Sequence, residues 1–278
     1  MPRSRLVVAA LMAGVALISY FASREVNTVT GETQHIAISQ EQEVALGLQS
    51  APQMAAELGG PDSDGSVQAD VESVGQRVVG RVAGKTPYRF RFQVLSSQTI
   101  NAFALPGGPV FITRALLASL ENEAQLAGVL GHEVGHVIGR HAAEHLTKSQ
   151  LAQGLVGAVG VAASDDRGRG QQAAQVAAVV AHMVQLKYGR GDELEADSLG
   201  IGLMSDAGYD PRALVDVMAI LARSSDGNRQ PEFLSSHPDP GNRQERIREV
   251  IAKRFPGGVP AGLKLGQRIT LRADSSSR

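Results

Sequence analysis

The chain has 278 residues, of which 43% are hydrophobic and 20% are charged, so it can form a globular protein with a sizeable core. Its 27 Lys and Arg residues nearly balance its 28 Asp and Glu residues, and the net charge of −1 gives no overall attraction for nucleic acid. The absence of cysteine excludes disulfides, thiolate zinc sites, iron–sulfur clusters and cysteine nucleophiles. Any bound metal must therefore be held by His, Asp or Glu.

The N-terminal segment, residues 1–23, has the pattern of a signal peptide or of an uncleaved signal-anchor. Arg3 and Arg5 precede an apolar run over residues 6–22 that is interrupted by Ser19 and Tyr20. This run is at the lower limit of the length that crosses a bilayer, and the small residues of a cleavage site are poorly placed. We predict that the rest of the chain is exported to the periplasm or cell envelope, anchored to the inner membrane if this segment stays attached.

The remaining chain is expected to be mostly helical with one small sheet. Residues 24–38 are predicted to be a polar linker, and Ser39 with Gln42 forms a capping-box pattern that begins the first helix. In chain order we expect helices over 39–58 and 67–82, strands over 88–95, 99–105 and 110–113, and helices over 114–120, 122–148, 192–207, 211–222 and 240–253.

A Gly/Ala/Val-rich region over residues 151–186 is predicted to be a helical hairpin whose solvated tip is 164–170. We interpret it as core packing, with a docking surface for partners or a membrane as the alternative. Residues 255–278 are expected to be a tail. The whole pattern predicts an α+β fold with one domain over residues 39–254.

A metal-binding motif lies within the predicted helix 122–148. His132 and His136 are four residues apart, so both imidazoles project from one face of the helix and can bind a single zinc ion. Glu133 sits beside the first histidine, where it can act as general base towards a water molecule at the metal. Apolar residues flank the motif, and burial of these polar groups would be costly without a partner. We therefore predict one zinc ion per chain.

The spacing alone leaves three candidates for the third zinc ligand. Gly139 matches the metzincin pattern, but the position that requires histidine is Ala142. His141 and His145 match an inverted zincin motif. On a continuous helix, however, His141 would be turned about 140° from His136, so we interpret His141 and His145 as surface or packing residues.

The third candidate is a carboxylate from the predicted helix 192–207. Glu193 and Asp197 are four residues apart and share a face of that helix, whereas Glu195 points roughly the opposite way. One face thus offers a zinc ligand and a carboxylate that can accept a hydrogen bond from a ligand histidine. The alternative is that these residues bind no metal and form a solvent-exposed acidic first turn, which the helix dipole favours.

Four motifs in a fixed order give these residues a family context. They are NAFALPGGPVFIT over 101–113, GHEVGHVIGRH over 131–141, YGRGDELEADSLG over 188–200 and SSHPDPGNRQERI over 235–247. With the opening ISQEQEVALG, the chain resembles the HtpX, BepA and CAAX prenyl-protease gluzincins, metallopeptidase family forty-eight, over about residues 36–250. In layout it is closest to a stand-alone BepA-like protease domain of the zincin type, exported or singly anchored.

The resemblance implies the roles of five residues at the metal. The zinc ligands would be His132, His136 and Glu193. Glu133 would be the catalytic base, and Asp197 would accept a hydrogen bond from a ligand histidine.

The resemblance also implies a substrate-pairing strand and a latency device. The strand consists of Asn101, Ala102, Phe103 and Ala104, and it would pair with an extended peptide beside the cleft. His237 would bind zinc as a fourth ligand and hold the enzyme latent, because a site closed by four ligands has no position for water.

The function that follows is a zinc-dependent endopeptidase that cleaves unfolded or damaged envelope proteins. The expected partners are polypeptide substrates and, through the N-terminal segment, a membrane; no nucleic acid and no particular oligomeric state is expected. Tyr188, Arg190 or Arg243 would stabilise the oxyanion, and the sequence does not choose among them. The alternatives are a chaperone-like binding protein with a plugged, non-catalytic zinc site and a hydrolase of non-peptide bonds.

Overall fold

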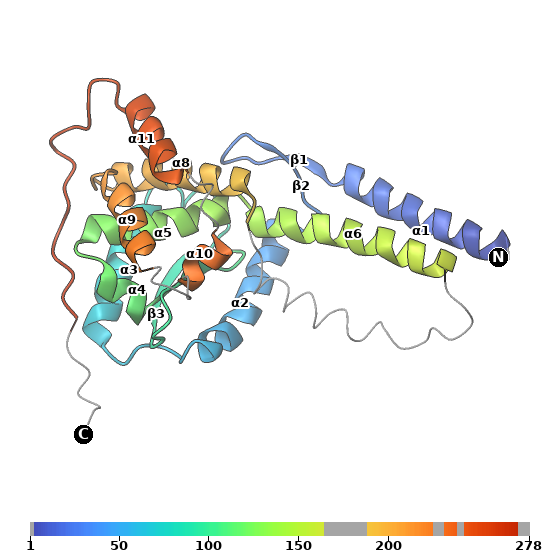
Figure 1. Cartoon of the computed structure of the whole chain (residues 1–278), viewed down its shortest axis with the longest axis horizontal. Coiled ribbons are helices and arrows are strands. Elements are labelled where there is room, and N and C mark those ends of the chain that lie inside the picture. The colour runs from blue at the N-terminus through green and yellow to red at the C-terminus, as the bar shows by residue number, and fades with distance from the viewer. Residues whose placement is uncertain (1–2, 164–187, 225–230, 238–241, 272–278) are drawn as a thin grey trace.

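The computed structural model describes residues 3–163, 188–224, 231–237 and 242–271, and in these residues the fold is α+β and mostly helical, as the sequence predicted. A body built around a small sheet carries a pair of long helices that projects from one side (Figure 1).

A three-stranded sheet precedes the helix that carries the metal-binding motif, as expected. Its strands, in spatial order, are β3 (Arg91–Leu95), β5 (Pro109–Thr113) and β4 (Ala102–Ala104). β3 is parallel and β4 antiparallel to the central strand, all of whose residues are buried. No other strand pairs with β4 among the described residues, so β4 is an edge strand of this sheet.

The helices of the body pack around α5 (Glu123–Ile138), which carries the motif. Every residue of α5 after Glu123 is buried, as its apolar sequence requires. Three helices contact α5 most directly: α3 (Gly65–Val79), α8 (Arg190–Asp206) and α9 (Ala213–Arg223). The other helices of the body are α2 (Gln40–Glu57), α4 (Arg114–Ser119), α10 (Glu232–Ser236) and α11 (Arg243–Arg254). Ser39 and Gln42 form the expected capping box at the start of α2.

Glycines let α5 and α8 approach each other closely. A Cβ atom on Gly200 of α8 would lie 2.9 Å from the carbonyl carbon of Gly131 on α5. A Cβ atom on Gly135 would lie 2.8 Å from the carbonyl oxygen of Ala196. Both distances are shorter than ordinary contacts, so larger side chains would push the helices apart. This close crossing brings the acidic first turn of α8 beside the histidines of α5.

The prediction of one continuous helix over residues 122–148 was wrong. The chain leaves α5 at Gly139 and begins α6 (His141–Ala163) directly after Arg140. Arg140 has a φ of 57°, a left-handed conformation that cannot continue an α-helix. Its guanidinium is buried and donates from Nε to Glu43 Oε1 at 2.7 Å, so a buried ion pair holds the turn.

Residues 24–38, expected as a linker, form an ordered hairpin that caps the end of α5. Its two antiparallel strands are β1 (Arg24–Val26) and β2 (Thr33–His35). The side-chain amide of Asn27 donates to the carbonyl of Ile138 at 2.8 Å, and that of Gln34 donates to the carbonyl of Gly139 at 2.6 Å. Because the last carbonyls of a helix have no partner within it, these bonds satisfy the C-terminal end of α5.

The projecting pair consists of α1 (Arg3–Ala22) and α6, which lie side by side (Figure 1). Over residues 4–22, α1 is long and apolar enough to cross a membrane, judged by length and composition. The first arm of the predicted hairpin, up to residue 163, belongs to α6 and packs against α1. The second arm and the tip lie outside the described residues.

Candidate metal centre

Two imidazoles of α5 point to one place in the protein interior. His132 and His136 are both almost fully buried, and their Nε2 atoms lie 3.0 Å apart. The four-residue spacing produces this convergence, as expected. Two ring nitrogens that face each other at this distance require a proton or a metal ion between them.

The first turn of α8 adds a carboxylate to the two imidazoles. Glu193 is fully buried, with Oε1 3.4 Å from His136 Nε2 and Oε2 3.5 Å from His132 Nε2. Burial alone would raise the pKa of this carboxyl group, but His237, His132 and His136 hold it well below its usual range. Glu193 is therefore an ionised carboxylate among histidines.

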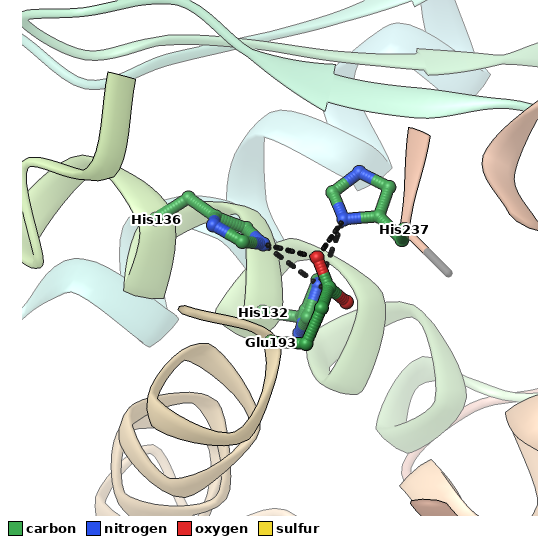
Figure 2. A group of neighbouring side chains, drawn as sticks. All are labelled: His132, His136, Glu193 and His237. Carbon is green, nitrogen blue, oxygen red and sulfur yellow. Dashed lines mark hydrogen bonds and ion pairs between the residues drawn. The ribbon is translucent and has the colours of Figure 1, made fainter. Parts of the chain in front are cut away.

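A third imidazole approaches from the residue that follows α10. The Nδ1 atom of His237 lies 3.0 Å from Glu193 Oε1 and 3.2 Å from His132 Nε2, and its ring is buried. One ligand atom from each of His132, His136, Glu193 and His237 lies within 4.8 Å of all the others (Figure 2). Three segments that are distant in the sequence thus meet at one place. We call the four side chains the metal cluster, because together they could hold one metal ion.

The metal cluster fits a cation of the zinc type. Three imidazole nitrogens and one carboxylate are ligands that zinc binds in tetrahedral geometry. Burial and the Arg243 guanidinium favour the neutral form of His132. Hydrogen bonds to Asp197 and Glu193 outweigh both effects and raise the pKa of His132 to about 9. Without a metal ion the cluster therefore attracts a proton, and a bound cation would satisfy the same carboxylates.

Glu133 lies next to the metal cluster but is not one of its four ligands. Its side chain is buried and lines the cavity beside the cluster. Its Oε1 atom has no hydrogen-bond partner among the described residues, and the ring atom Nε2 of His237 is 3.5 Å away. A buried carboxylate oxygen without a partner is costly, so it indicates a group that bonds to something else in function. A general base needs this position.

Asp197 and Arg243 hold the His132 ring in position. Asp197 Oδ1 lies 2.9 Å from His132 Nδ1, the contact by which a carboxylate orients a ligand histidine. Arg243, buried on α11, donates to both oxygens of Asp197 at 2.8 Å. Burial would raise the pKa of Asp197, and the charges of Arg243 and His132 lower it, so the carboxylate stays ionised.

His141 contacts a cluster histidine directly, although the sequence indicated a surface or packing residue. The left-handed turn at Arg140 brings its Nδ1 atom to 2.8 Å from His136 Nδ1. His141 is buried, and its Nε2 atom lies 3.2 Å from Glu195 Oε2. On the continuous helix that the sequence predicts, His141 would point away from His136, and Glu195 lies on the face of its helix opposite Glu193 and Asp197, so local patterns singled out neither residue.

We expect His141→Ala to weaken zinc binding about 10- to 100-fold, because His136 loses the partner that orients its ring. Competition with a chromogenic zinc chelator measures the affinity. His145→Ala is the matched control, since His145 lies on the same helix, pairs with Asp192 at 2.6 Å and contacts no cluster residue through a hydrogen bond or ion pair. Equal zinc affinities of the wild type and His141→Ala would contradict this role.

An open cavity of about 330 Å³ lies beside the metal cluster. The predicted substrate strand borders it through Asn101, Phe103 and Ala104, whereas Ala102 is fully buried within β4. Residues in and just after α2 and one residue of α10, which the sequence did not single out, also line it: Met54, Glu57, Leu58 and Glu232. The cavity thus joins an open strand edge to the buried carboxylate of Glu133.

Tyr188 is the one oxyanion candidate that lines this cavity in the described structure. Its ring stacks on His136 with 3.9 Å between the ring centres. Arg190 is exposed at the start of α8, and Arg243 is buried, pairs with Asp197 and Glu193 and does not line the cavity. Burial raises the pKa of the Tyr188 hydroxyl group, which therefore stays protonated and able to donate a hydrogen bond.

A buried helix that directs two imidazoles to one point and a carboxylate into a cleft is the arrangement of the zincin-type metallopeptidases, and this protein is one of that class. The family model described as Peptidase family M48 matches residues 66–251, more than half of the chain. The chain therefore belongs to peptidase family M48, as the resemblance of the motifs implied.

Three relatives illustrate the range of similar proteins. The beta-barrel assembly-enhancing protease of Escherichia coli (strain K12) is 32% identical over 198 residues, which cover 66% of this chain and 40% of that protein. The mitochondrial metalloendopeptidase OMA1 of Arabidopsis thaliana is 32% identical over 56% of this chain and 30% of its own length. The mitochondrial metalloendopeptidase OMA1 of Bos taurus is 29% identical over 257 residues, which cover 84% of this chain and 47% of that protein. The chain thus spans less than half the length of these relatives.

Proposed function

We propose that this M48 metalloendopeptidase uses zinc to cleave unfolded polypeptides of the cell envelope. The observation that carries the proposal is the buried carboxylate of Glu133, which lines the open cavity beside the metal cluster and whose Oε1 atom accepts no hydrogen bond from the described residues. A general base needs this position.

The roles of the residues follow from their positions. His132, His136 and Glu193 would hold the zinc ion, which when bound polarises a peptide carbonyl and lowers the pKa of water. Glu133 accepts the proton of the attacking water and returns it to the leaving amine nitrogen. Asp197 fixes the His132 ring so that Nε2 remains the free nitrogen.

The substrate adds to the open edge of β4 as an extended strand. The backbone of Asn101–Ala104 then pairs with the peptide, while Tyr188 donates a hydrogen bond to the oxyanion that forms at the scissile carbonyl. An extended strand is available only in an unfolded or locally unfolded protein. This requirement, rather than a side-chain pocket, favours unfolded and damaged chains as substrates.

We also propose that His237 holds the enzyme latent as a displaceable fourth ligand. Its Nδ1 atom lies close enough to Glu193 and His132 to complete a closed site, and such a site leaves no position for water. The same closed arrangement favours the second candidate function, a chaperone-like binding protein in which the zinc site is permanently plugged.

The cell envelope is proposed on two grounds. The apolar α1 has the length and composition of a membrane anchor. The second ground is the similarity to the beta-barrel assembly-enhancing protease of Escherichia coli, whereas the relatives named OMA1 are mitochondrial.

Cleavage of casein, an unfolded protein, tests the function. We expect the zinc-loaded full chain to cleave casein, a chelator to stop cleavage, and one equivalent of added zinc to restore it. Magnesium, which prefers six oxygen ligands, should not restore cleavage, because the cluster offers mainly imidazole nitrogens. Casein that binds to the zinc-loaded protein and stays intact would favour the binding protein instead.

A further inference from the structure

The helix pair of α1 and α6, which projects from the body (Figure 1), exposes many apolar side chains. Exposed apolar side chains of α1 include Leu6, Val7, Leu11, Val15, Ile18 and Phe21. On α6, the side chain of Val156 is 71% exposed. Exposed positions such as 6, 7, 8 and 11 point to several sides of α1. A protein partner would cover one face, whereas lipid surrounds a helix on every free side.

The two helices contact each other through small residues. A Cβ atom on Gly154 of α6 would lie 2.8 Å from the Cβ of Ala16 on α1, and one on Gly157 would lie 3.5 Å from Met12 Cε. Small residues let helix backbones approach, which is how helices associate within membranes. These contacts align residue 154 with 16 and residue 157 with 12, so the helices run antiparallel.

The same alignment brings the last charge of α6 and the first charge after α1 to one level. Lys148 is the last charged residue of α6 in its described part, and the alignment places it beside Ala22, two residues before Arg24. From residue 149 to 163, α6 contains no Asp, Glu, Lys or Arg, and this part lies along the apolar part of α1. Its exposed glutamines, Gln150 and Gln153, are at the end near the body. At the end near the body, the two helices therefore lose their charged residues at the same level, although they are distant in the sequence.

We propose that α1 and residues 149–163 of α6 are embedded together in a lipid bilayer, and that α1 stays in the mature protein. The 20 residues of α1 extend about 30 Å, which matches the hydrocarbon core of a bilayer. Since α6 packs along α1 over the same depth, the lipid that surrounds α1 also surrounds the free face of α6.

The embedded pair would hold the metal cluster at the membrane surface. α6 begins at His141, whose ring contacts His136, so few residues separate the bilayer from the cluster. Substrates would then be chains that reach the membrane surface. This restriction rests on the proposed peptidase function, whereas the embedding of α6 does not.

Tryptophan fluorescence tests the embedding, because the chain has no tryptophan of its own. The full chain with Val156→Trp is reconstituted in phosphatidylcholine vesicles with or without bromine at the middle of the acyl chains. Leu48→Trp is the control outside the bilayer, since Leu48 is 52% exposed on α2. Leu11→Trp, on α1, is the control within it. Zinc content checks that each variant is folded.

We expect bromine to reduce the emission of Val156→Trp and of Leu11→Trp about twofold, because both residues lie near the middle of the 30 Å core, and to leave Leu48→Trp unchanged. Quenching of Leu11→Trp alone would overturn the embedding of α6. A blue-shifted Val156→Trp emission without quenching would show that protein covers α6, and would overturn it too. A mature chain that begins near residue 23 by mass spectrometry would overturn the retention of α1. None of these outcomes depends on peptidase activity.

Discussion

Glu133→Gln is expected to lower kcat/KM for casein about 10³-fold while the protein keeps its zinc. Glutamine has the size of glutamate but cannot accept the proton of the attacking water. Glu133 is not one of the four cluster ligands, so the substitution leaves the ligand set complete. The loss should therefore appear in kcat, with KM little changed.

Kinetics with fluorescent casein, with zinc content measured by atomic absorption, provide the test. Glu57→Gln is the control, because it removes a carboxylate from the lining of the same cavity at a position outside the metal cluster. We expect Glu57→Gln to keep most of the activity. If Glu133→Gln retained more than about a tenth of the wild-type rate, another group would have to be the base. The same variant separates the two candidate functions. If the protein only binds polypeptides, Glu133→Gln should leave that binding unchanged.

His237→Ala is expected to raise the rate of casein cleavage about tenfold. The magnitude corresponds to a resting state in which the fourth ligand is in place in about nine of ten molecules, because the observed rate scales with the competent fraction. The three remaining ligands, His132, His136 and Glu193, would still hold one zinc ion.

Steady-state rates at equal zinc occupancy measure this effect. His145→Ala is a matched control, because His145 is a nearby, partly buried histidine whose partner is Asp192 rather than a cluster residue. An unchanged or lower rate of His237→Ala, with zinc still bound, would show that His237 is not a plug. An increase in both variants would point to general loosening of the site instead.

Local patterns were sufficient to predict much of the fold. The small sheet before the motif helix, the capping box at Ser39 and the helical character of the rest follow from alternation, helix periodicity and capping residues. The break between α5 and α6 could not be predicted in this way. It depends on Arg140, whose left-handed backbone is held by Glu43, a residue 97 positions earlier in the chain.

The sequence by itself determined the pair of His132 and His136 and the placement of Glu133 beside it, because residues on one helix have a fixed spacing. The resemblance of the four motifs to peptidase family M48 added Glu193 and His237, and in the structure both lie in the metal cluster.

Only the tertiary structure decided which other residues surround that cluster. His141 contacts the far side of His136, and Glu195 contacts His141, because α5 breaks and α8 crosses it closely over glycines. The pairing of α1 with α6 likewise joins two apolar segments that the sequence presented as unrelated. Spacing along a helix is set by local geometry, whereas contacts between helices depend on how their surfaces pack, and single-residue patterns do not encode that packing.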